Sequence, residues 1–125
     1  MNDNLSSPVL PHHKLLAYGV ARELLLAVLR CHVRDAKLRD EAVRSAKSTC
    51  LNCAEGAGRV TRADKARAFA IARAEAVEAA AAVEIAVLCG DAPAEPAREV
   101  ARSPTGSSRC SRGSAAKRPS AIRDH

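Results

Sequence analysis

Residues 13–90 contain no proline, so nothing in this stretch interrupts a long helix. The prolines all lie outside it, at Pro8, Pro11, Pro93, Pro96, Pro104 and Pro119. Alanine, the strongest helix former, accounts for 27 of the 125 residues, whereas aromatic residues make up only 2%. The chain is also poor in the β-branched and aromatic residues that strands prefer. The sequence therefore predicts an all-α protein and argues against a β-sandwich.

Apolar residues recur at helical spacing in three segments, which predicts helices over residues 13–33, 38–55 and 61–89. The stripe of the third segment consists of Phe69, Ala72, Ala76, Ala79, Val83 and Ala86. The stripes of the first two consist of Ala17, Val20, Leu24, Ala27 and Cys31, and of Val43, Ala46, Cys50 and Cys53. Short connections make neighbouring helices antiparallel. We therefore predict an up-down antiparallel helical bundle with three clear helices.

Local signals predict where these helices begin and end. Gly56 follows the second stripe and is expected to cap that helix in a conformation with positive φ. The run Thr61-Arg62-Ala63-Asp64 has the form of a capping box for the third helix. Gly90, with Pro93 behind it, is expected to stop that helix.

Composition divides the chain into three parts: a disordered N-terminus over 1–12, a helical bundle over 13–90, and a Pro/Ser/Arg-rich disordered tail over 91–125. The tail has few apolar residues to offset the entropy lost on ordering. A short helix around 94–102 is compatible with its sequence. The stripes are mostly alanine, which buries little area, and the first helix is apolar on more than one side. We therefore expect a homo-oligomer.

The expected cellular location rests on membrane-spanning and signal segments, which the sequence does not show. No segment approaches the roughly 18–20 uninterrupted apolar residues of a membrane span. The N-terminus lacks the basic and apolar runs of a signal peptide. The five cysteines of a chain without such a signal point to reduced thiols. We expect a cytoplasmic protein without membrane contact.

Three short motifs carry a resemblance to a known family. They are RSAKS at 44–48, NCAEG at 52–56 and GR at 58–59. Together they resemble the signature of the bacterial four-helix-bundle family encoded within 23S ribosomal RNA intervening sequences. The resemblance implies helical hairpins that assemble into a ring, commonly a pentamer. A related branch, the accessory protein of diversity-generating retroelements, works with a reverse transcriptase and has a basic surface for nucleic acid.

The chain departs from the family pattern at three places. Cys53 stands where isoleucine is usual, and Ala74-Glu75 stands where Gly-Ser is usual. The family's fourth helix should follow Gly90, where the Pro/Ser/Arg-rich tail begins. We therefore expect the fourth helix to be missing or replaced by the basic tail.

Positive charge is concentrated in the middle of the chain, with ten basic against five acidic residues from 34 to 73, within a net charge of +6. Closely spaced cations bind phosphate through counterion release. In a ring, the cations near the second turn would form a basic rim. The alternative is an ordinary solvated face, since no aromatic residues interleave for base stacking. The candidate nucleic-acid-binding residues are Arg59, Arg62, Lys65, Arg67 and Lys47.

A polar line on the second helix consists of Arg44, Ser48, Asn52 and Glu55, at spacings of four, four and three. It predicts either a ligand groove or a polar seam between helices or subunits, hydrogen-bonded internally. Because buried polar groups are usually paired, the seam is the better interpretation, with Glu78 as partner of Arg44.

Cys50 and Cys53 have the spacing of a metal or redox pair, and His12 and His13 are the only nearby candidates for further ligands. Because the cysteines lie on apolar stripes, we predict buried thiols, no metal and no cofactor. No catalytic motif is present, so we predict no enzyme. The expected function is that of a self-associating bundle that binds RNA or DNA through its basic rim. The alternative is an assembly or accessory factor for a protein partner such as a reverse transcriptase.

Overall fold

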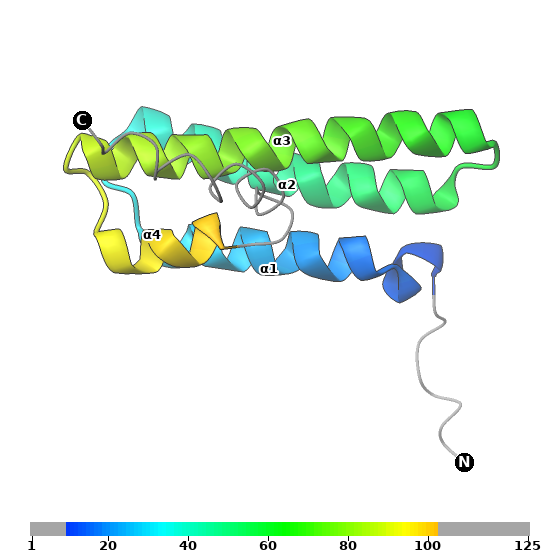
Figure 1. The fold of residues 1–125 in the computed structure, drawn as a ribbon, viewed down its shortest axis with the longest axis horizontal. Coiled ribbons are helices and arrows are strands. Elements are labelled where there is room, and N and C mark those ends of the chain that lie inside the picture. Colours follow the sequence, from blue (N-terminus) through cyan, green and yellow to red (C-terminus); the bar gives the residue numbers. More distant parts are fainter. Residues whose placement is uncertain (1–9, 103–125) are drawn as a thin grey trace, which may run out of the picture.

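A computed structural model of the chain describes residues 10–102, and within this range the secondary structure is entirely helical (Figure 1). A 3-10 turn, Pro11–Lys14, precedes four α-helices. These are α1 (Leu16–Cys31), α2 (Ala36–Gly58), α3 (Arg62–Leu88) and α4 (Ala94–Ala101). The predicted all-α class is confirmed.

Successive helices run antiparallel and form an up-down-up-down bundle (Figure 1). The longest contact joins α2 to α3, while α1 packs against α2 and α4. The short α4 also contacts α3 and thus closes the fourth side of one half of the bundle. None of the helices between residues 10 and 102 combines the length and apolar character needed to cross a membrane.

Small side chains dominate the core, and Leu24, Val83 and Val100 are its largest fully buried members. Helices lined with alanine can approach one another closely, but each contact buries little apolar area. The predicted stripe of α3 is confirmed except at Phe69, which is only half-buried. The predicted stripe of α1 is buried at Leu24, Ala27 and Cys31 but only half-buried at Ala17 and Val20, and Ala21 and Val28 are buried in addition. The buried stripe residues of α3 are Ala72, Ala76, Ala79, Val83 and Ala86.

The buried face of α2 is rotated from the predicted stripe. Val43 and Cys50 are half-buried, whereas Ser45 and Thr49 are completely enclosed. The Thr49 hydroxyl donates a hydrogen bond of 2.9 Å to the carbonyl oxygen of Ser45, so it needs no partner on another helix. This local pairing makes a polar residue acceptable in the core. The buried residues of α2 are Ala42, Ser45, Ala46, Thr49, Cys53 and Gly56.

The predicted domain boundary at residue 90 is too early, because α4 continues the bundle. Its Ala97 and Val100 are buried in the main core cluster. On its outer side, Glu99 accepts a hydrogen bond of 2.6 Å from Arg30 of α1. The fourth helix is therefore present, although it has 8 residues against 27 in α3.

The boundary predicted at the other end also moves, because the 3-10 turn Pro11–Lys14 begins inside the expected N-terminal segment 1–12. The rest of that segment, 1–9, and the tail 103–125 lie outside the described residues.

The predicted ends of α3 are confirmed. The Thr61 hydroxyl accepts a hydrogen bond of 3.1 Å from the backbone N–H of Asp64, which caps the first turn. Gly90 adopts a φ of 79°, a left-handed conformation that glycine tolerates best, immediately after the last turn. Beside it, the loop before α2 is tied to the loop before α4, since the N–H of Arg34 donates to the carbonyl of Asp91 at 2.8 Å.

The predicted role of Gly56 is wrong, because α2 continues through it to Gly58. Gly56 is buried, and a Cβ atom at this position would lie 2.7 Å from a ring carbon of Phe69 on α3. The residue is therefore glycine because the aromatic ring occupies the space of a side chain. No positive φ is involved.

We expect Gly56→Ala to lower the free energy of unfolding by about 1–3 kcal/mol relative to Gly58→Ala, because the added methyl group overpacks the Phe69 contact. Gly58 is a matched control in the same turn, since nothing lies within 4 Å of its Cβ position. Chemical denaturation of both variants measures the difference. Equal stabilities would contradict the packing role of Gly56.

Candidate nucleic-acid interface and polar seam

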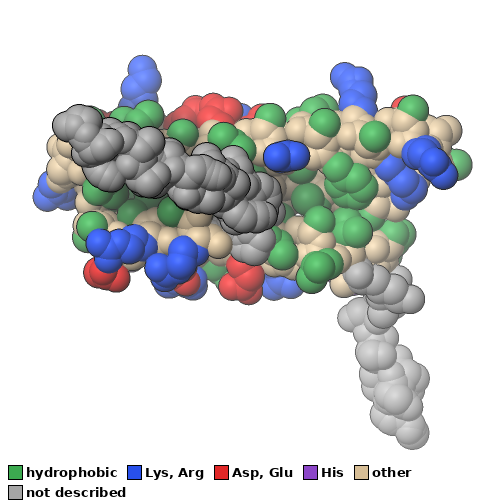
Figure 2. All heavy atoms as spheres, viewed as in Figure 1, with side chains coloured by type: hydrophobic (Ala, Val, Ile, Leu, Met, Phe, Trp, Pro, Cys, Tyr) green, Lys and Arg blue, Asp and Glu red, His purple; other side chains and the backbone are tan. Residues whose placement is uncertain are grey.

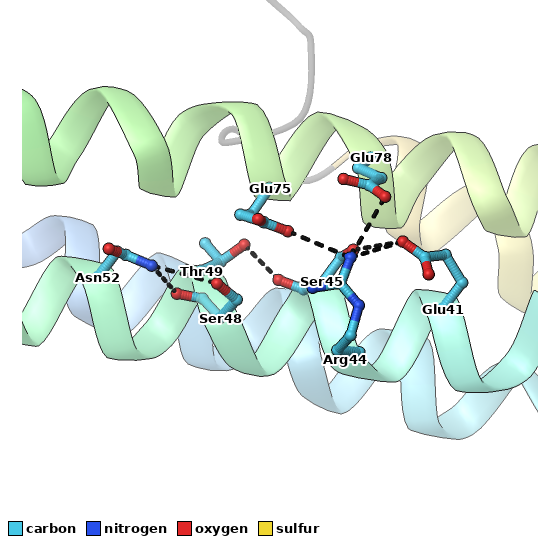
Figure 3. A network of polar contacts seen from close by, with 8 residues as sticks. All are labelled: Glu41, Arg44, Ser45, Ser48, Thr49, Asn52, Glu75 and Glu78. Atoms are coloured by element: carbon cyan, nitrogen blue, oxygen red, sulfur yellow. Dashed lines mark hydrogen bonds and ion pairs between the residues drawn. The ribbon is translucent and has the colours of Figure 1, made fainter.

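The polar residues of α2 lie along the edge where this helix meets α3 (Figure 3). At the centre of one cluster, the Arg44 guanidinium lies 2.6 Å from a carboxylate oxygen of Glu41. It also reaches across to α3, at 3.3 Å from Glu78 and 3.8 Å from Glu75. The predicted pairing of Arg44 with Glu78 is present in the structure. Neither Glu41 nor Glu75 was predicted. The proximity of Glu75 depends on the register of α2 against α3, whereas Glu41 precedes Arg44 by three residues on the same helix, a local spacing that could have identified it.

The Arg44 cluster holds three carboxylates around one cation. The hydrogen bond from Arg44 lowers the pKa of Glu41 to about 2. A side-chain hydrogen bond with Glu41 raises the pKa of Glu78, and nearby negative charge adds to this shift. One carboxylate oxygen of Glu75 is buried without a hydrogen-bond partner among the described residues. Arg44 is therefore engaged by three carboxylates and is not free to bind a phosphate.

The rest of the predicted polar line forms hydrogen bonds within α2. Both bonds of the Asn52 amide go to Ser48, at 2.9 Å to its carbonyl oxygen and 3.1 Å to its hydroxyl (Figure 3). Glu55 forms an ion pair with Arg59, one turn further along. Asn52 and Ser48 are half-buried, while Arg44 and Glu55 are exposed. The line is thus a continuous polar edge, connected to α3 through Arg44.

The pKa of Glu41 provides a test of the Arg44 cluster. A carboxyl group with a lowered pKa stabilises the fold above its ordinary pKa of 4.5, and this stabilisation is lost as the pH falls toward about 2. We expect Arg44→Met to raise the pKa of Glu41 toward 4.5, as measured by NMR titration of the glutamate carboxyls. Arg98→Met, which breaks the ion pair with Glu95 on α4, is the control and leaves Glu41 unchanged. An unchanged Glu41 titration in Arg44→Met would show that the ion pair is absent in solution.

The candidate cations divide into separate groups. Arg59, Arg62 and Arg67 are exposed around the turn between α2 and α3, where Figure 2 shows basic side chains at the right-hand end. Lys65 is half-buried, and its ammonium group donates to the carbonyl oxygens of Gly56 at 3.3 Å and Ala57 at 3.2 Å. It therefore caps the end of α2.

Lys47 is exposed in the middle of α2. It precedes Arg59 by three turns of helix, or about 18 Å along the axis. The basic turn accordingly consists of Arg59, Arg62 and Arg67, and Lys47 lies away from it.

A polar groove of about 310 Å³ lies between the end of α2 and the beginning of α3. It joins two predicted sets, since the polar line supplies Asn52 and Glu55 and the basic turn supplies Arg59 and Arg67. The groove also includes Asp64, Ala68 and Ile71, which the sequence did not indicate as site residues. The complete lining is Asn52, Glu55, Arg59, Asp64, Arg67, Ala68 and Ile71.

The cysteine pair lies in a packed region. Cys53 is buried in a small cluster with Ala21 and Ala72, and Cys50 packs against the same cluster. Burial raises the pKa of both thiols, which disfavours the thiolate form that binds metals. His12 packs edge-on against Tyr18, with ring centroids 4.7 Å apart. Between residues 10 and 102, no three potential metal ligands come together.

The motifs on α2 resemble those of one bundle family, and the structure has the four helices that this family would require. A family profile described as 23S rRNA-intervening sequence protein matches residues 13–103. The chain belongs to this family. The match continues past Gly90 and includes α4, in agreement with the structure. No curated protein matches the chain.

Proposed function

We propose that this member of the family is a non-enzymatic, self-associating bundle that contacts RNA or DNA phosphates through the basic turn. The observation that carries the proposal is the convergence of Arg59, Arg62 and Arg67, all exposed, at one end of the α2–α3 hairpin. Arg59 is paired with Glu55, whereas Arg62 and Arg67 form no ion pair with any residue between 10 and 102. Arginine presents a planar fork of donors that matches phosphate oxygens. The excess of cations over anions gives an isoelectric point of about 9.4 and favours association with polyanions.

The charge distribution along the α2–α3 edge supports one orientation for a polyanion. The Arg44 cluster has three carboxylates for one arginine and therefore repels phosphate. The basic turn lies further along the same hairpin, beyond Asn52. A strand that approaches this edge would thus be held at the turn and kept away from the cluster.

Salt dependence tests the phosphate contacts. We expect the double substitution Arg62→Ala/Arg67→Ala to weaken binding of a single-stranded RNA and to reduce the slope of log affinity against log salt by about 0.7 per lost contact. Fluorescence anisotropy over a salt series measures both quantities. The control Lys37→Ala/Arg73→Ala removes two exposed cations elsewhere on the hairpin. Identical slopes for the two double variants would refute binding through the turn.

Exposed apolar residues support self-association. Helix α3 has apolar side chains on its outer side as well as its inner side, and Val77 and Leu88 are 48% and 81% exposed. On the face shown in Figure 2, hydrophobic side chains continue along α3 and α1 past the end of α4. A helix that is apolar on opposite sides usually packs on both. The pentameric ring is what membership of the family implies for the number of copies.

Solution mass tests the assembly. We expect light scattering to give a multiple of the 13.2 kDa chain mass. Val77→Glu is expected to shift the protein toward the monomer, because it places a charge on the apolar outer side of α3. The control Lys37→Glu alters the charge of a polar surface and leaves the mass unchanged. A monomeric wild-type chain would contradict self-association.

The alternative function is that of an assembly or accessory factor for a protein partner such as a reverse transcriptase. It is favoured by an apolar groove of about 460 Å³ between α3 and α4, whose lining includes Val77, Ala81 and Leu88. A partner that stays bound to the purified protein after nuclease treatment would support this function. The free cysteines between residues 10 and 102, of which Cys31 and Cys53 are buried and Cys89 is exposed, fit a reducing, cytoplasmic location for either function.

A further inference from the structure

We propose that the polar groove between α2 and α3 receives a single unpaired nucleotide of a nucleic-acid strand. The inference rests on the nucleic-acid contact proposed above and adds a site that selects single strands over duplex. The groove lies directly beside the basic turn, because Arg59 and Arg67 belong to both. A strand held at the turn by its phosphates would therefore carry a base to the mouth of the groove.

Asn52 gives the groove one hydrogen-bonding atom that is available to a ligand. Both bonds of its amide nitrogen go to Ser48, which fixes the side chain against α2. An asparagine amide has two N–H donors, so the carbonyl oxygen remains as the acceptor. This oxygen can accept a hydrogen bond from the exocyclic amino group of a base. That amino group is accessible when the base is unpaired or when it is contacted at its groove edge.

Arg67 supplies the cation for the adjoining phosphate. Its side chain is exposed on the first turns of α3 and forms no ion pair with any residue between 10 and 102. Arg59, on the opposite side of the groove, is paired with Glu55. Of the two arginines, Arg67 can therefore bind a phosphate without first breaking an internal ion pair.

Ile71 and Ala68 provide an apolar wall against which a base can lie. Ile71 is 39% exposed, while Ala68 is buried beneath the surface. The volume of about 310 Å³ is near the lower end for small-molecule sites, which matches one nucleotide. In a duplex the bases are stacked and paired, and unstacking one costs a few kcal/mol. A duplex would thus reach only the arginines at the rim.

A pair of substitutions on the same helix tests the site. Ile71→Ser removes the apolar side chain from the wall of the groove without adding charge beside Arg67, whereas Ile85→Ser makes the same change roughly 21 Å away along α3. The two isoleucines have similar exposure, at 39% and 46%, so the loss of apolar surface and the structural cost are matched. Affinities for a 12-nucleotide single-stranded RNA, the same sequence as single-stranded DNA, and a duplex of equal length are measured by fluorescence anisotropy. Circular dichroism verifies that each variant is folded.

We expect Ile71→Ser to weaken binding of both single strands at least fivefold relative to Ile85→Ser, and to leave duplex binding equal in the two variants. Equal single-strand affinities of these variants would overturn the groove, while binding through the basic turn would still stand. Failure of the wild type to bind any of the three probes would instead overturn the proposed function, and the groove with it.

Asn52→Leu provides an independent measurement, since it removes the acceptor without changing the charge. We expect it to weaken single-strand binding at least threefold and to keep the salt slope of the wild type. A changed salt slope with no loss of affinity at low salt would contradict a base contact.

Adenosine monophosphate, tested as a competitor, distinguishes a site for a free nucleotide from a site for a nucleotide within a strand. We expect it to compete only weakly, and competition as strong as that of the 12-nucleotide strand would overturn the assignment to a strand.

Discussion

The close packing of α2 on α3 is the contact on which the rest of the molecule depends. Small residues on the inner face of α2 allow the two helix backbones to approach, and the ring of Phe69 fills the space above Gly56. This contact fixes the register of the hairpin. The register in turn places Arg44 opposite Glu78 and brings Arg67 beside Asn52. The polar seam and the groove are therefore both products of one helix–helix contact.

Two kinds of arginine follow from that register. Arg44 is surrounded by carboxylates from both helices, so its charge is engaged in ion pairs within the polar seam. Arg62 and Arg67 lie on the first turns of α3 and form no ion pair with any residue between 10 and 102, although Glu55 and Asp64 line the adjoining groove. The separation of an ion-paired arginine from arginines without ion pairs, rather than the total charge, is what gives the hairpin a basic end.

The fold was largely predictable from the sequence, because the absence of proline, the alanine periodicity and the Thr61 and Gly90 signals are all local. The inner face of α2 was mispredicted, since Ser45 and Thr49 look polar until their hydrogen bonds within the helix are counted. The packing of α4 in the bundle was not predicted, because its segment is mostly polar and has only two buried residues, Ala97 and Val100. The groove was beyond sequence analysis, as its lining depends on how two helices align.

The brevity of α4 affects how the bundle opens. This helix is attached by two buried side chains and an ion pair between exposed groups, so it has fewer contacts with the bundle than α2 has with α3. Local unfolding proceeds most readily where few apolar contacts are lost. Detachment of α4 alone would hydrate the side of the core that Ala97 and Val100 cover, while the hairpin stays intact. The molecule thus has two levels of stability, and its amide protons in α4 would exchange with solvent well before those at the centre of α3.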